Sequence, residues 1–192
     1  LITAPYVLLE PDQPTSTVAF PDGIALTNEG FLLVILDGVG ENIMRDESMM
    51  PNLASRLEES AVLSVTTGPL TLSATCVREM MTGVPNAPID GLKNFNMGHP
   101  GGEDPWLLAA RSDRYSVGMI GSYVMGNLYG DNPDIEFVNT FEGHADYYEG
   151  DDATGELLEE WLGTDRHDVI AAHFSGPDKV GHKWGIVSDE YR

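Results

Sequence analysis

The sequence predicts an α/β protein whose mainly parallel sheet is sandwiched by helices. Short apolar runs typical of buried strands alternate along the chain with segments of helical spacing, and this alternation is the pattern of βαβ units. Hydrophobic residues make up 42% of the 192 residues, a globular composition that can fill one core. No apolar run approaches the roughly 20 residues that cross a bilayer.

The first predicted elements are a strand, a helix and a second strand. Residues 31–36, FLLVIL, form a continuous apolar run of the kind that is buried on both faces of a parallel sheet. In residues 50–61, MPNLASRLEESA, a proline suited to a first helical turn precedes leucines at helical spacing. The second strand is expected at residues 62–67, VLSVTT, before the break GPL.

A further helix and a long loop follow. The helix is expected to begin near Ser73, to run through ATCVREMM and to end at Gly83, with Pro85 beyond it. Residues 84–105 are rich in Gly, Pro and Asn and indicate a loop, and loops of this length are usually functional or mobile.

The second half of the chain supplies the remaining elements. In order, we expect a short helix, two strands, an amphipathic helix that begins with a capping aspartate, and a last strand, at residues 106–112, 115–121, 134–140, 152–162 and 168–174. We find no internal repeat, low-complexity tract or domain boundary along this stretch.

The charge and the cysteine content exclude several classes of function. The formal net charge is −21, from 31 acidic against 10 basic residues, so nucleic acid is not expected as a partner. The acidic runs are typical of a solvated face, and the acid excess with few lysines suggests a salt-adapted source. Cys76 is the only cysteine, so any metal ion must be held by oxygen and imidazole ligands.

Several candidate functional residues directly follow predicted strands. Asp37, Ser73 and Asp178 each come after one, and we expect them to gather at the edge where the carboxyl ends of parallel strands meet. Within HFSGPDKVGH, Asp178 and His182 are four residues apart, so a helical turn would point both the same way and could hold a divalent metal.

Each of these residues also has a purely structural interpretation. Asp178 could cap a helix, and His182 could be an ordinary surface histidine. Asp37 begins the turn dipeptide Asp-Gly. Ser73 could be a helix N-cap, and Thr71 and Thr75 beside it are rival hydroxyls.

Taken together, the four residues predict metal-assisted attack on an anionic tetrahedral centre such as phosphate. Two hard or borderline cations would neutralise the nonbridging oxygens and assist a serine nucleophile. Oxygen and imidazole ligands suit zinc, with manganese as an alternative, whereas calcium prefers more oxygens.

Three ordered motifs, LVILDGVGE, SATCVREMMTGVP and HFSGPDKVGHKWG, resemble those of the alkaline phosphatase superfamily. The similarity is to the branch of type I phosphodiesterases, nucleotide pyrophosphatases and ethanolamine phosphate transferases of GPI-anchor synthesis, and it is strongest to the transferases, whose H-F-L-G-x-D-x-x-G-H motif the last segment follows closely. It covers nearly the whole chain from about Phe31 onward. The resemblance implies an alkaline phosphatase-like fold.

The resemblance also implies roles for single residues. The family's nucleophile lies ten positions before the glycine of a threonine-glycine pair, here Thr82 and Gly83, and that position is Ser73. Asp37 would bind the metal that also holds Ser73, and Asp178 and His182 would bind the second. The serine departs from the threonine that the transferases and diesterases generally use. Arg78 and the loop residues Asn94 and Asn96 are weaker candidates for phosphate or substrate contacts.

The superfamily completes its two-metal site with a later aspartate-histidine pair and a further histidine, which nothing after His182 supplies. The other histidines lie earlier in the chain. We expect His173 at a strand end, and His99, His144 and His167 in surface or loop positions. We therefore expect residues 1–30 to be a lead-in and residues 31–192 to be the N-terminal part of a catalytic domain, an incomplete domain that is inactive alone.

The leading functional hypothesis is a metal-dependent transferase or hydrolase that acts on phosphodiesters through a phosphorylated serine. The alternatives are a phosphomonoesterase or phosphomutase with the same core, and a catalytically inactive domain that binds anionic glycans or lipids. The resemblance implies a small-molecule or lipid-linked phosphodiester as substrate. It also implies an extracytoplasmic domain with a membrane tether outside these residues.

Overall fold

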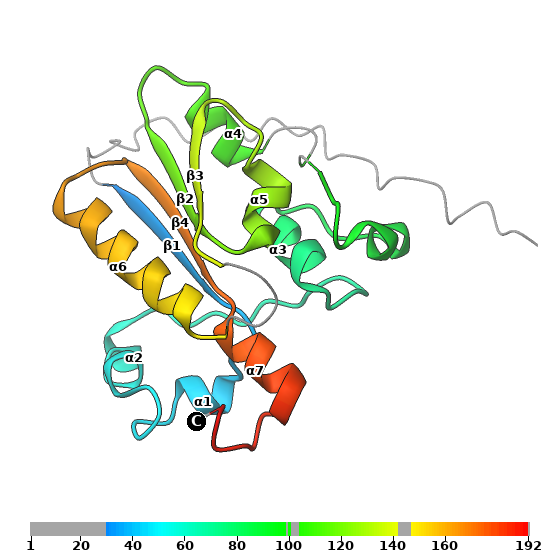
Figure 1. Ribbon diagram of the computed structural model, residues 1–192, viewed down its shortest axis with the longest axis vertical. Coiled ribbons are helices and arrows are strands. Elements are labelled where there is room, and N and C mark those ends of the chain that lie inside the picture. The colour runs from blue at the N-terminus through cyan, green and yellow to red at the C-terminus, as the bar shows by residue number, and fades with distance from the viewer. Residues whose placement is uncertain (1–29, 99, 101–103, 142–146, 192) are drawn as a thin grey trace, which may run out of the picture.

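The computed structural model describes residues 30–98, 100, 104–141 and 147–191. Within these residues, four strands form one all-parallel sheet in the order β1-β4-β2-β3 (Figure 1). The strands are β1 (Phe31–Leu36), β2 (Val117–Gly121), β3 (Ile135–Asn139) and β4 (Val169–Phe174). The predicted α/β class with a mainly parallel sheet is confirmed.

Helices lie on both faces of the sheet and at the carboxyl ends of its strands. The helices α3, α4 and α5 lie on one face and α6 on the other, whereas α1, α2 and α7 lie beyond the strand ends (Figure 1). The bounds are α1 (Glu41–Met44), α2 (Pro51–Ala54), α3 (Ser73–Thr82), α4 (Pro105–Ala110), α5 (Tyr123–Tyr129), α6 (Glu149–Gly163) and α7 (Gly176–Trp184), with short 3-10 helices η2 (Leu57–Glu59) and η3 (Pro88–Lys93). No helix within the described residues combines the length and hydropathy of a membrane span.

The core has two parts because successive residues of a strand point to opposite faces. On the larger side, Met119 and Ala171 pack with the buried faces of α3, α4 and α5. On the other side, Ile120 and Ile170 pack against Trp161 of α6. Both layers therefore depend on the central strands β2 and β4.

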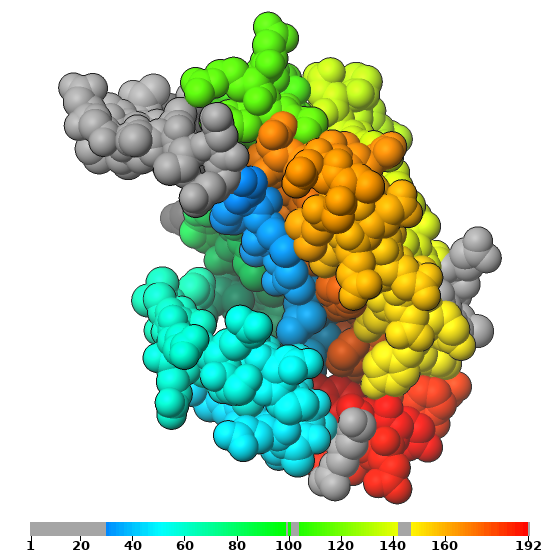
Figure 2. All heavy atoms as spheres, turned by 90° about the vertical axis from the view of Figure 1, so that its left-hand side faces the viewer, coloured from blue at the N-terminus to red at the C-terminus, as the bar shows by residue number. Residues whose placement is uncertain are grey.

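Strand β1 does not have the environment that its sequence predicts. It lies at the edge of the sheet, and among the described residues it pairs with β4 alone. Phe31 and Val34 are 57% and 44% exposed, and Figure 2 shows the atoms of β1 uncovered along this face. The prediction of burial on both faces was wrong, because an apolar run does not reveal how many neighbours a strand acquires.

Two other predictions of local structure were also wrong. Residues 62–67 form no strand, and Leu63 and Val65 in this segment are more than four-fifths exposed. A strand needs a ladder partner, and the described chain brings none to this segment. The helix predicted from residue 152 instead begins at Glu149, with Tyr148 as its N-cap, so Asp152 lies inside the first turn and is no cap.

Candidate active site

The ends of β1 and β4 bring the first and the last motif together. The parallel register sets Leu36 beside Phe174, and the Asp37 amide donates to the Phe174 carbonyl at 2.9 Å. The chain leaves β4 and enters α7 at Gly176, so Asp178 lies in the first turn of that helix. Asp37 and Asp178 therefore reach the same edge of the sheet, as predicted.

Gly38 sets the close approach of these two segments. Its φ is +77°, and a Cβ atom built on it would lie 2.6 Å from the Asp178 Cα and 2.7 Å from the Asp178 nitrogen. Only glycine combines this left-handed conformation with so little space. The carbonyl of Gly38 also accepts a hydrogen bond from the Tyr191 hydroxyl. The Asp37 turn is thus packed directly against the backbone of α7.

Two side chains lie beside the Asp37 carboxylate. One is Ser73, whose hydroxyl lowers the pKa of Asp37, and the other is His173, whose Nε2 lies 3.5 Å from Asp37 Oδ2 without hydrogen-bond geometry. Burial alone would raise the pKa of Asp37, but the His173 ring, the Ser73 hydroxyl and the Gly38 amide together lower it. Asp37 is therefore a stable carboxylate that faces the candidate nucleophile.

The Asp178 carboxylate lies in a different electrostatic environment. Burial and the negative charge of Asp37 raise its pKa, against smaller opposing effects of His182, His173 and Lys179. His182 Nε2 lies 3.4 Å from Asp178 Oδ1, which is the predicted juxtaposition one helical turn apart. A cleft of about 190 Å³ adjoins this pair and is lined by Gly38, Pro177, Asp178, Gly181, His182 and Ile186.

Ser73 is the first residue of α3 and not its cap. The N-cap is Leu72, whose carbonyl accepts a hydrogen bond from the Thr75 hydroxyl at 2.8 Å. Thr75 is only 1% exposed, whereas Thr71 lies exposed before the helix. Of the three hydroxyls considered, Ser73 is the one that lowers the pKa of Asp37.

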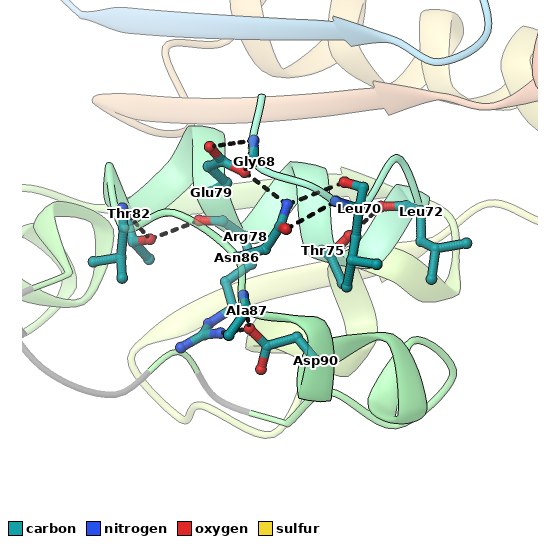
Figure 3. Close-up of polar contacts among 11 residues, drawn as sticks. Gly68, Leu70, Leu72, Thr75, Arg78, Glu79, Thr82, Asn86, Ala87 and Asp90 are labelled. Carbon is teal, nitrogen blue, oxygen red and sulfur yellow. Dashed lines mark hydrogen bonds and ion pairs between the residues drawn. The ribbon is translucent and has the colours of Figure 1, made fainter. Parts of the chain in front are cut away.

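The segment that leads to Ser73 is held against α3 by a polar network (Figure 3). The Glu79 carboxylate accepts the amide of Gly68 at 3.0 Å and the Asn86 side chain at 2.7 Å. Asn86 also bonds both the amide and the carbonyl of Leu70, each at 3.1 Å. These bonds fix the approach of the chain to Ser73.

Arg78 and Asn94 have structural partners. Arg78 Nη1 lies 3.4 Å from Asp90 Oδ2, and the same carboxylate oxygen accepts the Ala87 amide (Figure 3). Arg78 therefore forms a salt bridge within the loop region after α3. Asn94 is buried, and its Oδ1 accepts the Ala74 amide at 3.2 Å in the first turn of α3. The loop after α3, which contains η3, thus returns to support the start of that helix.

Asp151, which sequence reasoning did not single out, fixes the start of α7. Its carboxylate accepts the Ser175 amide at 2.9 Å and the Gly176 amide at 3.0 Å. Burial raises the pKa of Asp151, and the two amides only partly oppose this effect. The first backbone amides of a helix normally lack partners within that helix. Asp151 of α6 therefore caps the start of α7 from a neighbouring helix.

Other residues near the site also follow from the topology. Ser122 is the N-cap of α5 directly after β2, and its strand-end position is the same signal that marks Asp37. Burial raises the pKa of the Tyr123 phenol, and the charges of Asp178 and Asp37 raise it further. The hydroxyl of Tyr123 is therefore close enough to both carboxylates to be affected by their charge. His167 lies in a loop, as expected, but its ring packs on Trp161 at 4.6 Å; His99 and His144 lie outside the described residues.

The side chains of the candidate site are of the types that bind divalent cations, but they are arranged as two separate pairs of ligands. Asp37 with Ser73, and Asp178 with His182, offer oxygen and imidazole ligands of the kind that zinc and manganese accept. Among the described residues, no group of three or more His, Cys, Asp or Glu side chains could hold one ion. The repulsion between Asp37 and Asp178 is the electrostatic feature that a cation would relieve.

Comparison with known proteins adds no family assignment. The chain matches no protein-family model and no curated protein.

Proposed function

We propose that this chain carries the nucleophile and the first ligands of a metal-dependent phosphoester transferase or hydrolase of the alkaline phosphatase superfamily. The observation that supports it most directly is that Ser73 lies beside Asp37 and lowers its pKa, next to Asp178 at one edge of the sheet. Three motifs far apart in the sequence supply these residues, and each of them belongs to the motif pattern on which the resemblance rests.

Ser73 is well placed to act as a nucleophile. It begins a helix of ten residues, where the dipole favours negative charge on an alkoxide or a phosphate. Its hydroxyl proton is directed at a carboxylate whose pKa is lowered, so that carboxylate remains ionised and ready to accept hydrogen bonds at neutral pH.

The acidic and imidazole side chains would hold the metal ions. Asp37 and Ser73 would bind one ion, and Asp178 and His182 the other. Zinc or manganese, when bound, would withdraw charge from the phosphate oxygens and lower the cost of forming the alkoxide. Gly38 holds the two groups of ligands in contact through its backbone packing on Asp178.

In the proposed reaction, Ser73 Oγ forms a bond to phosphorus while the bond from phosphorus to the departing alcohol oxygen breaks. The proton of Ser73 passes to solvent water, and the departing oxygen takes up a proton from solvent to leave as an alcohol. Water or an acceptor hydroxyl then displaces Ser73 from the phosphorylated serine. The resemblance extends this proposal to lipid-linked phosphodiesters and ethanolamine phosphate transfer, with an extracytoplasmic location.

The direct test uses the full-length protein that contains this region, with bis(p-nitrophenyl) phosphate and added zinc or manganese. Ser73→Ala should lower kcat by at least about 10³-fold, as loss of a nucleophile does elsewhere. Thr71→Ala, which removes an exposed neighbouring hydroxyl, is the matched control and should retain activity. Mass spectrometry should find trapped phosphate on the peptide at Ser73.

Two results would contradict the assignment. Full turnover by Ser73→Ala would remove Ser73 as nucleophile, and trapped phosphate on Thr71 would relocate it. Faster cleavage of p-nitrophenyl phosphate than of the diester would favour the phosphomonoesterase alternative. Binding of anionic glycans or lipids without turnover would favour the inactive domain.

A further inference from the structure

His173 is fully buried at the end of β4, and its two ring nitrogens face different partners. Nδ1 lies 3.0 Å from Ser122 Oγ, and Nε2 lies 3.5 Å from Asp37 Oδ2. Within the described residues Nε2 meets no hydrogen-bond acceptor at ideal geometry, so this long contact with Asp37 is the one available to it. The imidazole thus bridges the start of α5 and the carboxylate that faces Ser73.

Ser122 determines which nitrogen carries the proton. Its Oγ accepts the Val124 amide at 3.3 Å as the N-cap of α5, and the residue is only 1% exposed. The hydroxyl proton therefore needs a buried acceptor, and His173 Nδ1 is the one at hydrogen-bond distance. A ring with a proton on Nδ1 would leave that hydroxyl proton unpaired. A ring with its proton on Nε2 and none on Nδ1 satisfies both contacts.

A glycine in the neighbouring strand allows the backbone to pack closely against His173. Gly121, just before Ser122, has a φ of +141°, and a Cβ atom there would lie 2.6 Å from the His173 carbonyl oxygen and 2.9 Å from the His173 Cβ. A larger residue would push the β2–α5 turn away from β4. This close approach is what brings Ser122 Oγ to the ring.

We infer that His173 is a positioning residue: Ser122 at Nδ1 orients the ring so that Nε2 carries a proton and points at Asp37, and this keeps the carboxylate turned toward Ser73. The inference deepens the proposed function and rests on it only for the effect on turnover. The chain of contacts runs from the cap of α5 to the start of α3. It assigns a role in the site to a histidine that would otherwise belong only to the core.

The first test is independent of activity. Ring ¹⁵N NMR of the full chain, metal-free and at neutral pH, should show His173 with Nε2 protonated and Nδ1 bare. Ser122→Ala should lose this signature, and Ser122→Thr, which retains the hydroxyl, should restore it. A wild-type ring protonated on Nδ1, or one that averages both tautomers, would overturn the inference whether or not Ser73 is a nucleophile.

The second test separates the two nitrogens by substitution. In His173→Gln the amide reaches the place of Nε2 and can still donate to Asp37, whereas in His173→Asn it reaches only the place of Nδ1. We expect Asn to lower zinc affinity and kcat by about 10- to 100-fold with KM nearly unchanged, and Gln to lose markedly less. Equal losses in both variants, or none in either, would reduce His173 to a packing residue. If neither variant folds, the tautomer measurement decides.

Discussion

The two carboxylates of the candidate site lie side by side and behave in opposite ways. The effects of His173 and Ser73 outweigh burial and lower the pKa of Asp37. Burial, reinforced by the charge of Asp37, raises the pKa of Asp178. The difference lies in their partners: the protein itself satisfies Asp37, whereas Asp178 is opposed by a neighbour of like charge.

The Asp37 half and the Asp178 half of the site differ in how firmly the folded chain holds their side chains. Asp37 is half-buried, and the fully buried His173 and the Ser73 hydroxyl lie beside it before any ligand binds. In the Asp178 half, the partner His182 is 82% exposed and contributes little fixed geometry. A divalent cation between the halves would remove the repulsion that the folded chain retains.

The largest expected effect comes from separating the two halves at Gly38. Gly38→Ala combines a left-handed backbone with a collision against the Asp178 backbone, so it should cost about 3 kcal/mol or more in the free energy of unfolding. Urea denaturation measures this loss.

Gly83→Ala is the matched control for that substitution. Gly83 has a φ of +69° at the end of α3, but a Cβ atom there would meet nothing within 4 Å. Backbone strain alone should cost about 1 kcal/mol. Equal losses in the two variants would show that Gly38 does not pack against α7.

The next effect concerns the support of α7. Asp151→Ala removes the acceptor for the Ser175 and Gly176 amides, and loss of a cap costs about 1 kcal/mol. Hydrogen exchange at these two amides should accelerate, with amides at the far end of α6 unchanged as the internal reference. Unchanged protection at Ser175 and Gly176 would rule out Asp151 as the cap.

Neutralising each carboxylate tests the comparison directly. Asp37→Asn weakens charge-assisted hydrogen bonds and should lower stability by about 1–2 kcal/mol. Asp178→Asn should change it by less than about 0.5 kcal/mol, because relief from Asp37 opposes the loss of a favourable charge at the start of α7. Thermal denaturation without metal measures both, and a larger loss for Asp178→Asn would contradict the assignment.

Added zinc should raise the melting temperature of the wild type more than that of either variant, because each variant loses one metal ligand. Arg45→Ala, on the exposed surface, should leave the zinc effect intact and serves as the control. An equal shift in all four proteins would indicate that zinc binds elsewhere.

The smallest effect is the pH dependence of the metal-free protein. The native pKa of Asp178 lies above 3.8, so in the window just above that value the native state binds more protons than the unfolded state, and stability falls as pH rises through it. The native pKa of Asp37 lies below 3.8, so its contribution is present above that value and is lost as pH falls below it.

Unfolding free energies across the acid range separate these two contributions. As pH falls through the window above 3.8, the wild type should gain stability relative to Asp178→Asn. Below 3.8 its advantage over Asp37→Asn should shrink. Parallel curves for both variants would show that the two carboxylates do not differ in the folded state.

Part of the site could be predicted because it depends on local sequence. Asp37 ends a strand, Ser73 begins a helix, and Asp178 and His182 share a helical face, and each of these statements depends on residues within a few positions. The expectation that Asp37 and Asp178 meet follows from one topological rule for parallel sheets, which the structure obeys. Ser73 reaches the same place for another reason, because residues 62–67 before it form no strand.

The remainder was decided by pairing between distant segments. The apolar run of β1 predicted burial on both faces, but the strand order put it at an edge, and residues 62–67 acquired no ladder partner among the described residues. The sequence placed His173 only at a strand end, because its contact with Ser122 spans 51 positions.

By itself, then, the sequence determined the succession of strands and helices and the ends at which reactive side chains stand, because backbone propensity and side-chain period act over short distances. Only the tertiary structure decided which strand became the edge, which carboxylate received hydrogen bonds and which was left facing a like charge. Those outcomes depend on burial and on distances between groups far apart in the chain, and no local pattern encodes them.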